Sequence, residues 1–515
     1  MTRMRRINTD FICINLLNPR IRVLFFLVRR MQGLCGSKKN LTNNCVCFTH
    51  FFLIVLKPKP IAMCIRNLLS FVLPLIVFAS CNTGTNTIAD TDTAKTDGHP
   101  DWIMQGNIYE VNTRQYTPEG TFKAFEKHLG RLKEMGVQTL WFMPINPISK
   151  TDRKGSLGSY YAVSDYTAIN PEYGSMDDWK ELVKNAHSKG FKVLIDWVPN
   201  HTGADHYWLT KHPDFYVKDS TGKPVSQFDW TDTRKLNFNN PELCDTMIAQ
   251  MKFWVTETGI DGFRCDYAVG PTRAFWSECI KELKSLKNIF LLAETDSAWL
   301  HTVGFDATYA WPEFGMMKLI AAGKRHASAL DSVFAFTDST LPANGLRLFF
   351  TSNHDENSWN QADFNTMPGA SHAPFAVLTQ TMKRGIPLVY SGQEEPVLRA
   401  IKFFDKDTMG FTKYARAPFY QKLLTLHSTD KALAANASFT RIHTKNDDHI
   451  YAFAREAGSN KVLVVLNLSN APQTVSIDNA VINGEATEIF TGMKESLQAG
   501  RTFSLAAWGY QVYRY

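Results

Sequence analysis

Two hydrophobic periods alternate along the chain between residues 101 and 432. Short apolar runs are typical of buried strands, and the stretches between them, with apolar side chains every three or four positions, are typical of helices. We expect strands at 108–112, 139–144, 192–197, 262–266, 290–294, 348–352 and 387–390. The helices expected between them include 121–135, a helix from Ser175 to Gly190, and one that opens at Asn240.

Repeated strand–helix units predict a parallel α/β sheet, because parallel neighbours need a crossover connection. About eight units over roughly 330 residues favour a (β/α)8 TIM barrel over an open doubly wound sheet. No glycine-rich phosphate loop follows an expected strand, which argues against a nucleotide-binding fold. The segment 202–238, after the third strand, is too long for a simple connection, and we expect it to form a short inserted loop domain that lines a site.

The pattern changes after residue 433. Short segments of alternating polarity follow, separated by Gly, Asn and Asp turns. They predict a C-terminal antiparallel β-sandwich domain over 433–515, next to a catalytic barrel over 101–432. Trp508, Tyr510 and Tyr513 are expected to pack this domain rather than bind a ligand.

The start of the chain differs in charge from the rest. Residues 1–81 hold 12 Lys or Arg and one acidic residue, whereas 82–515 have four more acidic than basic side chains. The overall charge of +7 therefore belongs to the leader, and nucleic-acid binding loses its main support. Six of the nine cysteines also lie at or before Cys81, and the other three have no metal-binding spacing and predict no disulfide framework.

Residues 63–81 have the plan of a secretory signal peptide, with Arg66, an apolar run over 68–78, and small residues before a cysteine. The ending Ala79-Ser80-Cys81 resembles the lipobox of bacterial lipoproteins. That resemblance implies that Cys81 is the lipid acceptor of an exported, membrane-anchored lipoprotein, in the periplasm or at the cell surface. A plain signal peptide or signal anchor is the alternative.

A signal peptide works only at the start of a chain, so residues 1–62 are interpreted as a non-native upstream extension and Met63 as the true first residue. Residues 82–100 are rich in Thr, Asp, Gly and Asn and predict a flexible tether.

Charged side chains stand at the ends of four expected strands. Because barrel enzymes build their sites from the carboxyl ends of strands, we expect these groups on one face. Taken singly, each has a structural alternative, such as an ion pair or a hydrogen-bonded loop histidine, but four strand ends together favour a site. The residues are Asp196, His201, Arg264, Asp266, Glu294, His354 and Asp355.

Paired carboxylates without a metal-type cluster suit glycosyl transfer. One ionised carboxylate attacks the anomeric carbon, and a protonated one donates to the leaving oxygen. Arg264 lies two residues before Asp266, so both point to the same side of the strand and the arginine would keep the carboxylate ionised. Cys265, between them, is expected to be an inert core thiol.

Four segments resemble, in order and spacing, the motifs of the α-amylase family, glycoside hydrolase family 13. They are Asp-Trp-Val-Pro-Asn-His at 196–201, Gly-Phe-Arg-Cys-Asp at 262–266, Glu294 after Leu-Leu-Ala, and Asn-His-Asp at 353–355. The resemblance extends over about 103–515 and includes the Tyr161-Ala-Val-Ser-Asp-Tyr166 segment.

The resemblance implies a role for each matched residue. Asp266 would be the nucleophile, Glu294 the general acid and base, and Asp355 the carboxylate that stabilises the transition state. In retaining enzymes the two working carboxyl groups are about 5–5.5 Å apart, and we predict that separation for Asp266 and Glu294. Roles in binding or ordering the reacting sugar are implied for Tyr161, Asp196, His201, Arg264 and His354.

The chemistry needs no cofactor, although a structural calcium ion is possible. Asn200 matches a calcium-binding position of many relatives, and a structural role as a cap or in the loop is the alternative. The loop residues Tyr207, Trp208, Phe228 and Trp230, with His206, could form a sugar-stacking platform or pack locally.

Together these roles predict an extracytoplasmic retaining hydrolase of α-glucans such as starch, maltodextrin or maltooligosaccharides, bound to a membrane through its lipid. The oligomeric state is open, with a monomer favoured. A transglycosylase or glucosyl-isomerase of the same family is the first alternative, and a glycan-binding lipoprotein without catalysis is the second. The segment Tyr267-Ala-Val-Gly270 departs from the Lys-His pair that many α-amylases have after the nucleophile. An endo-acting mode therefore does not follow from the resemblance.

Overall fold

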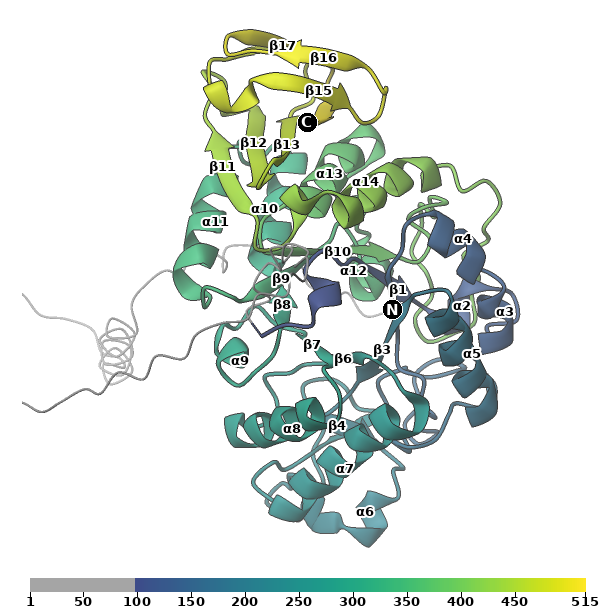
Figure 1. Ribbon diagram of the computed structural model, residues 1–515. Helices are drawn as coiled ribbons and strands as arrows, with labels where there is room; N and C mark the ends of the chain where they lie inside the picture. The colour runs from purple at the N-terminus through teal and green to yellow at the C-terminus, as the bar shows by residue number, and fades with distance from the viewer. Residues whose placement is uncertain (1–97) are drawn as a thin grey trace, which may run out of the picture. The chain divides into compact units, whose positions relative to one another are not determined.

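The computed structural model describes residues 98–515 (Figure 1). The expectations for the extension 1–62, for the signal peptide 63–81 with Cys81, and for most of the tether lie outside the described residues. Within the described range, none of the helices combines the length and the apolar character needed to cross a membrane.

Eight parallel strands close into a barrel, which confirms the predicted fold class. The order around the barrel is β1-β10-β9-β8-β7-β6-β3-β2. The strands are β1 (Ile108–Val111), β2 (Thr139–Phe142), β3 (Lys192–Trp197), β6 (Gly262–Cys265), β7 (Phe290–Ala293), β8 (Ala307–Tyr309), β9 (Leu346–Phe349) and β10 (Gly385–Tyr390).

Helices connect the strands, as a parallel sheet requires. Helix α5 begins with a capping box in which Ser175 and Asp178 bond each other's backbone N–H, and it buries Trp179 and Leu182. The α-helices are α2 (Thr113–Tyr116), α3 (Phe122–Glu126), α4 (Leu129–Glu134), α5 (Met176–Ser188), α6 (Trp208–Lys211), α7 (Pro241–Thr258), α8 (Arg273–Leu286), α9 (Trp299–Thr302), α10 (Trp311–Ala321), α11 (Ala329–Thr340), α12 (His354–Asn360), α13 (His372–Thr381) and α14 (Ala417–Thr429). Short 3-10 turns are η2 (Asp101–Ile103), η3 (Pro213–Phe215), η4 (Gly369–Ser371), η5 (Lys431–Leu433) and η6 (Ala480–Ile482).

Two expectations about single elements were wrong, and one strand was missed. The helix expected at 121–135 is two helices, α3 and α4, because His128 N–H bonds Phe125 O in a tighter turn between them. Strand β9 begins at Leu346 rather than 348, since the buried Arg347 within it interrupts the apolar run. Strand β8 was not foreseen: it has only three residues, too few for a periodic signal.

The segment between β3 and α7 forms a small inserted unit, as expected. Strand β4 (His201–Gly203) pairs antiparallel with β5 (Thr233–Lys235), and His201 stands opposite Lys235. Helix α6 and turn η3 lie between the two strands in the chain. This unit places residues 226–235 beside the barrel mouth, because β4 directly follows the end of β3.

The C-terminal part is antiparallel and has two sheets. Their orders are β11-β12-β13-β18-β15-β16 and β14-β17. The strands are β11 (Ser438–Ile442), β12 (Ile450–Ala457), β13 (Asn460–Asn467), β14 (Gln473–Ile477), β15 (Gly484–Glu488), β16 (Lys494–Leu497), β17 (Arg501–Leu505) and β18 (Tyr510–Arg514).

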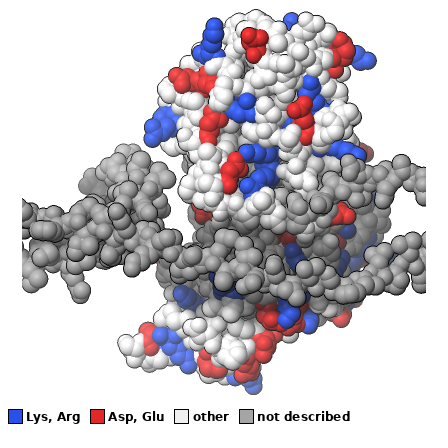
Figure 2. All heavy atoms as spheres, turned by 60° about the vertical axis from the view of Figure 1, so that its left-hand side comes forward, with Lys and Arg blue, Asp and Glu red and all other residues white. Residues whose placement is uncertain are grey.

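Strand alternation gives the larger C-terminal sheet two buried faces. Ala452 shares a core with Val475 and Phe503 of the smaller sheet, whereas Phe453 shares the core that includes Leu388 of the barrel. Of the aromatics expected to pack this part, Tyr513 contacts Phe503 within it, whereas Trp508 contacts Phe375 of α13 and Tyr510 contacts Phe419 of α14. On the face drawn in Figure 2, Lys and Arg are interspersed with Asp and Glu over the visible described residues.

Candidate active site

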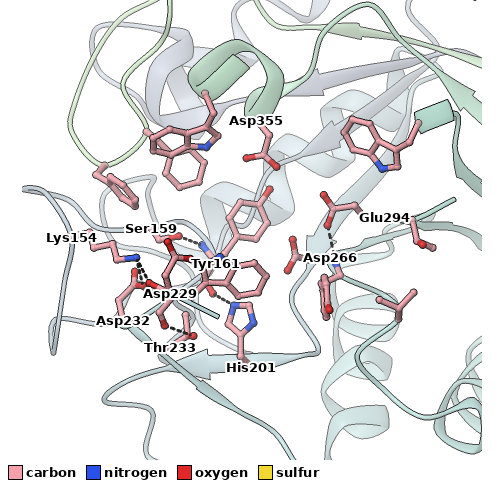
Figure 3. A pocket seen from close by; sticks show the side chains of 18 of the residues that line it. Lys154, Ser159, Tyr161, His201, Asp229, Asp232, Thr233, Asp266, Glu294 and Asp355 are labelled. Atoms are coloured by element: carbon pink, nitrogen blue, oxygen red, sulfur yellow. Dashed lines mark hydrogen bonds and ion pairs between the residues drawn. The ribbon is translucent and has the colours of Figure 1, made fainter. Parts of the chain in front are cut away.

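A cavity of about 680 Å³ lies at the carboxyl ends of the barrel strands. Arg264 belongs to β6, Asp266 and Glu294 directly follow β6 and β7, and Asp355 lies in the first turn of α12. The structure therefore brings the three carboxylates expected to be catalytic to one cavity, as Figure 3 shows. The predicted site residues that line it are Tyr161, His201, Asp266, Glu294 and Asp355.

One buried guanidinium connects three carboxylates. Arg264 Nη1 donates to Asp196 at 2.9 and 3.1 Å and to Asp266 Oδ1 at 3.1 Å. Its Nη2 forms an ion pair with Glu294 Oε1 at 2.8 Å, and its Nε donates to the Tyr309 hydroxyl at 3.1 Å. A buried charge must be paired, so these contacts hold the carboxylates in fixed relative positions. Their predicted separation of about 5–5.5 Å stays a prediction.

Burial raises the pKa values of the two carboxyl groups that the chemistry needs. The pKa of Asp266 rises to about 6 and that of Glu294 to about 7, because desolvation and neighbouring carboxylates outweigh the attraction of Arg264. The Tyr267 N–H, which donates to Glu294 Oε2 at 2.9 Å, lowers the pKa of Glu294. The order suits the roles: Asp266 ionises before Glu294 loses its proton.

We expect a bell-shaped dependence of kcat/KM on pH. Activity needs Asp266 ionised, so it falls below its pKa of about 6, and it needs Glu294 protonated, so it falls above its pKa of about 7. Initial rates on a maltooligosaccharide between about pH 4 and pH 9 would measure both limbs, which belong to the coupled pair. A profile that stays flat over that range would contradict these two roles.

A hydrogen-bonded chain runs from β1 to β3 beneath the cavity. His354 Nδ1 bonds Glu110 Oε1, its Nε2 lies 2.7 Å from the Tyr161 hydroxyl, and that hydroxyl donates to Asp196 Oδ2 at 3.1 Å. Burial opposes a charge on His354, but Asp355 and Glu110 outweigh it and raise the His354 pKa to about 9. The ring is therefore a cation that donates from both nitrogens and lies 3.4 Å from Asp355 Oδ2.

Glu110 is a site residue that sequence reasoning missed. It is fully buried and stands within β1, which was interpreted as an apolar strand. A lone carboxylate inside an apolar run was the signal that could have identified it, because charges are seldom buried without a partner.

Asn200 makes close contacts with two neighbouring residues. Its Nδ2 donates to His201 Nδ1 at 3.2 Å, and its Oδ1 faces Gly270, where a Cβ would come within 2.1 Å. Burial lowers the pKa of His201 to about 4, so the neutral ring donates from Nε2 to Tyr161 O at 3.1 Å. Calcium takes six to eight oxygen ligands. Over residues 98–515, no metal-type cluster of three acidic or histidine side chains includes these residues. The calcium role of Asn200 stays a prediction.

The loop aromatics divide between the two expected roles. Trp230 lines the cavity, whereas Trp208 is buried among Tyr166 and Phe215 and packs the inserted unit. Phe228 is exposed and meets Trp230 edge-on. Cys265 is buried, as expected. Cavity residues that the sequence did not single out are Lys154, Asp232, Trp311, Trp359, Phe403 and Phe404.

The closed barrel and its carboxylate cavity define an enzyme of the glycoside hydrolase class. A family model described as "Alpha amylase, catalytic domain" matches residues 85–409, and one described as "Maltogenic Amylase, C-terminal domain" matches residues 439–512. The chain therefore belongs to the α-amylase family of glycoside hydrolases.

Individual relatives agree with this assignment. The chain is 26% identical over 408 residues to "Alpha-amylase 2" of Dictyoglomus thermophilum, covering 72% of this chain and 67% of that protein. It is 32% identical over 205 residues to "Trehalose synthase" of Pimelobacter, covering 32% of this chain and 35% of the relative. The solved structure of a maltogenic α-amylase, AmyB, from Thermotoga neapolitana superimposes with a TM-score of 0.73 at 27% identity, covering 80% and 99% of the two chains.

Proposed function

We propose that this protein is a retaining hydrolase of α-glucans such as starch, maltodextrin or maltooligosaccharides. The observation that carries the proposal is the shared guanidinium: Arg264 contacts both Asp266 and Glu294 at a cavity that Asp355 also lines. Membership of a family whose named members include amylases supports the substrate class.

These positions support a double displacement. Asp266 attacks the anomeric carbon while Glu294 gives its proton to the leaving oxygen, and a glycosyl ester forms on Asp266. Glu294, now ionised, takes a proton from water, which attacks the same carbon and releases Asp266. Two displacements restore the original anomeric configuration. Arg264 favours the ionised form of Asp266 and limits the rise of its pKa.

Products from amylose, pullulan and maltose, separated by chromatography, test the proposal. Proton NMR at early times gives the anomer that forms first. We expect hydrolysis of at least one of the three, with α-anomeric products. A β-anomeric first product would contradict the double displacement. Hydrolysis of none of the three substrates would contradict the substrate class.

A transglycosylase or glucosyl-isomerase is the second candidate. The observation that favours it is the aromatic lining of the cavity by Trp311, Trp359 and Phe403, which in such an enzyme would limit the access of water to the glycosyl ester. At high maltose concentration such an enzyme would form new disaccharides or longer oligosaccharides in place of glucose. A glycan-binding protein without catalysis is disfavoured, because all three carboxylates are present at the cavity.

We also propose that the protein is exported and anchored through a lipid on Cys81, with 82–100 as the tether. The signal-peptide pattern of residues 63–81 supports this location. When the chain is expressed from Met63, the mature protein should enter the detergent phase in a Triton X-114 partition, whereas Cys81→Ala should stay aqueous. Equal partition of both would remove the proposal.

A further inference from the structure

A short segment borders the cavity through one of its residues. Residues 150–158, here called the bridging segment, follow β2 and carry the cavity residue Lys154. On one side lies the inserted unit, and on the other side lies the loop after β10, which holds Phe403 and Phe404. Both sides are attached to the bridging segment by hydrogen bonds.

Polar contacts attach the bridging segment to the inserted unit. Asp205 Oδ2 accepts from the backbone N–H groups of Lys150 and Thr151 at 2.7 and 3.1 Å. Arg234 Nη2 donates to Asp152 Oδ2 at 2.7 Å. These bonds hold the first half of the segment against Asp205, which follows β4, and Arg234, which lies in β5.

The second half of the bridging segment lies against the loop after β10. Leu157 N–H donates to Phe404 O at 2.9 Å, and Ser156 donates from its backbone and its hydroxyl to Asp405 Oδ1 at 2.8 and 2.7 Å. Gly155 has a φ of +63°, and a Cβ there would come within 2.5 Å of Phe404 Cβ. Only glycine, which has no Cβ, therefore fits at this contact. The hydrogen bonds on both sides show that the bridging segment joins two loops that are far apart in the chain.

Lys154 of the bridging segment lies at the end of the cavity away from the general acid. In Figure 3, Tyr161 and His201 lie between Glu294 on one side and Lys154 and Asp232 on the other. Glu294 protonates the leaving oxygen, so the leaving part of the substrate extends on its own side. The sugars that become bound to the nucleophile, and with them the non-reducing end of a glucan, point toward Lys154.

Lys154 and Asp232 have hydrogen-bonding capacity that the protein leaves free. Lys154 Nζ donates to Asp229 O at 3.1 Å and lies 3.5 Å from Asp232 Oδ1, which leaves at least one of its three N–H groups available. Asp232 is buried, and its Oδ2 has no hydrogen-bond partner among residues 98–515. Buried polar groups of native proteins are normally paired, and a sugar hydroxyl can act as both donor and acceptor.

We propose that the bridging segment closes the non-reducing end of the site, so that the enzyme removes short products from chain ends. Lys154, held by Asp232, binds the hydroxyl groups of the terminal sugar there. This inference rests on the proposed α-glucan hydrolysis and specifies its mode of attack. It also agrees with Tyr267-Ala-Val-Gly270, which departs from the segment after the nucleophile in many α-amylases.

A substrate blocked at its non-reducing end tests the closed end directly. Maltoheptaose and its 4,6-O-ethylidene derivative differ only in the terminal hydroxyl groups. We expect kcat/KM for the blocked substrate to be lower by about 100-fold or more, because its terminal sugar cannot enter a closed end. Values within about twofold of each other would overturn the inference while leaving hydrolysis intact. Hydrolysis of neither substrate would overturn the proposed function and this inference with it.

Variants test the two polar groups and the closure separately. Lys154→Ala and Asp232→Asn should each raise KM for maltotriose, and this rise should be about 10-fold larger than the rise in KM for α-glucosyl fluoride. α-Glucosyl fluoride has only the reacting sugar, so it does not extend to Lys154. Lys150→Ala, an exposed lysine of the same segment, is the matched control and should change neither value. Equal effects on both substrates would show a merely structural role and contradict the assignment.

Gly155→Ala should move the bridging segment away from Phe404 and open the end. The ratio of kcat/KM for the blocked substrate to kcat/KM for unblocked maltoheptaose should then increase at least about fivefold. Only a change in access to this end of the cavity would alter that ratio. Melting temperatures of all variants identify those that fail to fold. A folded Gly155→Ala protein with an unchanged ratio would contradict closure by this segment.

Discussion

Asp266→Asn is expected to lower kcat for maltooligosaccharides by about four orders of magnitude or more, because an amide cannot form the glycosyl ester. The substitution keeps the shape of the side chain, and its remaining oxygen can still accept from Arg264 Nη1, which now lies 3.1 Å from Asp266 Oδ1. Binding of maltotriose should therefore change by less than about 10-fold. Single-turnover kinetics and titration calorimetry measure the two quantities.

Asp245→Asn is the matched control, since Asp245 is exposed on α7 and does not line the cavity. It should keep the activity of the unchanged protein. If Asp266→Asn retained more than about one-hundredth of normal turnover with no deamidation, Asp266 would not be the nucleophile.

Glu294→Gln should show an effect that depends on the leaving group. Turnover of maltooligosaccharides should fall by about 10²–10⁴-fold, the usual contribution of general acid catalysis. α-Glucosyl fluoride needs no proton on its leaving group, so formation of the glycosyl ester from it should be much less affected. The ester should then accumulate, because glutamine cannot activate water for the second step.

Sodium azide sharpens this second prediction. Azide needs no general base, so it should restore turnover of α-glucosyl fluoride by Glu294→Gln and give α-glucosyl azide, with retained configuration. The alkaline limb of the pH profile should also be absent for this substrate, since the group with the pKa of about 7 has been removed. A uniform loss on both substrates without azide rescue would exclude Glu294 as the acid and base.

The grouping of Arg264 with the carboxylates of Asp266 and Asp196 was predictable, because the direction of side chains along a strand depends only on local geometry. Arg264 and Asp266 are two residues apart at the end of β6, and alternation puts both side chains on the same side. Asp196 stands opposite Arg264 in the parallel register between β3 and β6, so a correct strand assignment already brings these charges together.

Other parts of the site depend on partners distant in the chain. Glu110 meets His354 only because β1 closes the barrel next to β10, and the charge on His354 depends on that contact. The contacts of Asn200 with His201 and Gly270 could not be read from the sequence, where its role was open. Strand β8 was missed because three residues carry no periodic signal and its hydrogen bonds come entirely from its neighbours.

The sequence by itself determined the barrel, the C-terminal sheets and the charged strand ends, because periodicity and spacing along the chain encode them. Only the tertiary structure decided which loop residues share the cavity. Lys154, Asp232 and Phe404 come from three separate segments and meet where the bridging segment joins the inserted unit to the loop after β10. Contacts between loops depend on how the closed barrel arranges its strand ends, and no local pattern records them.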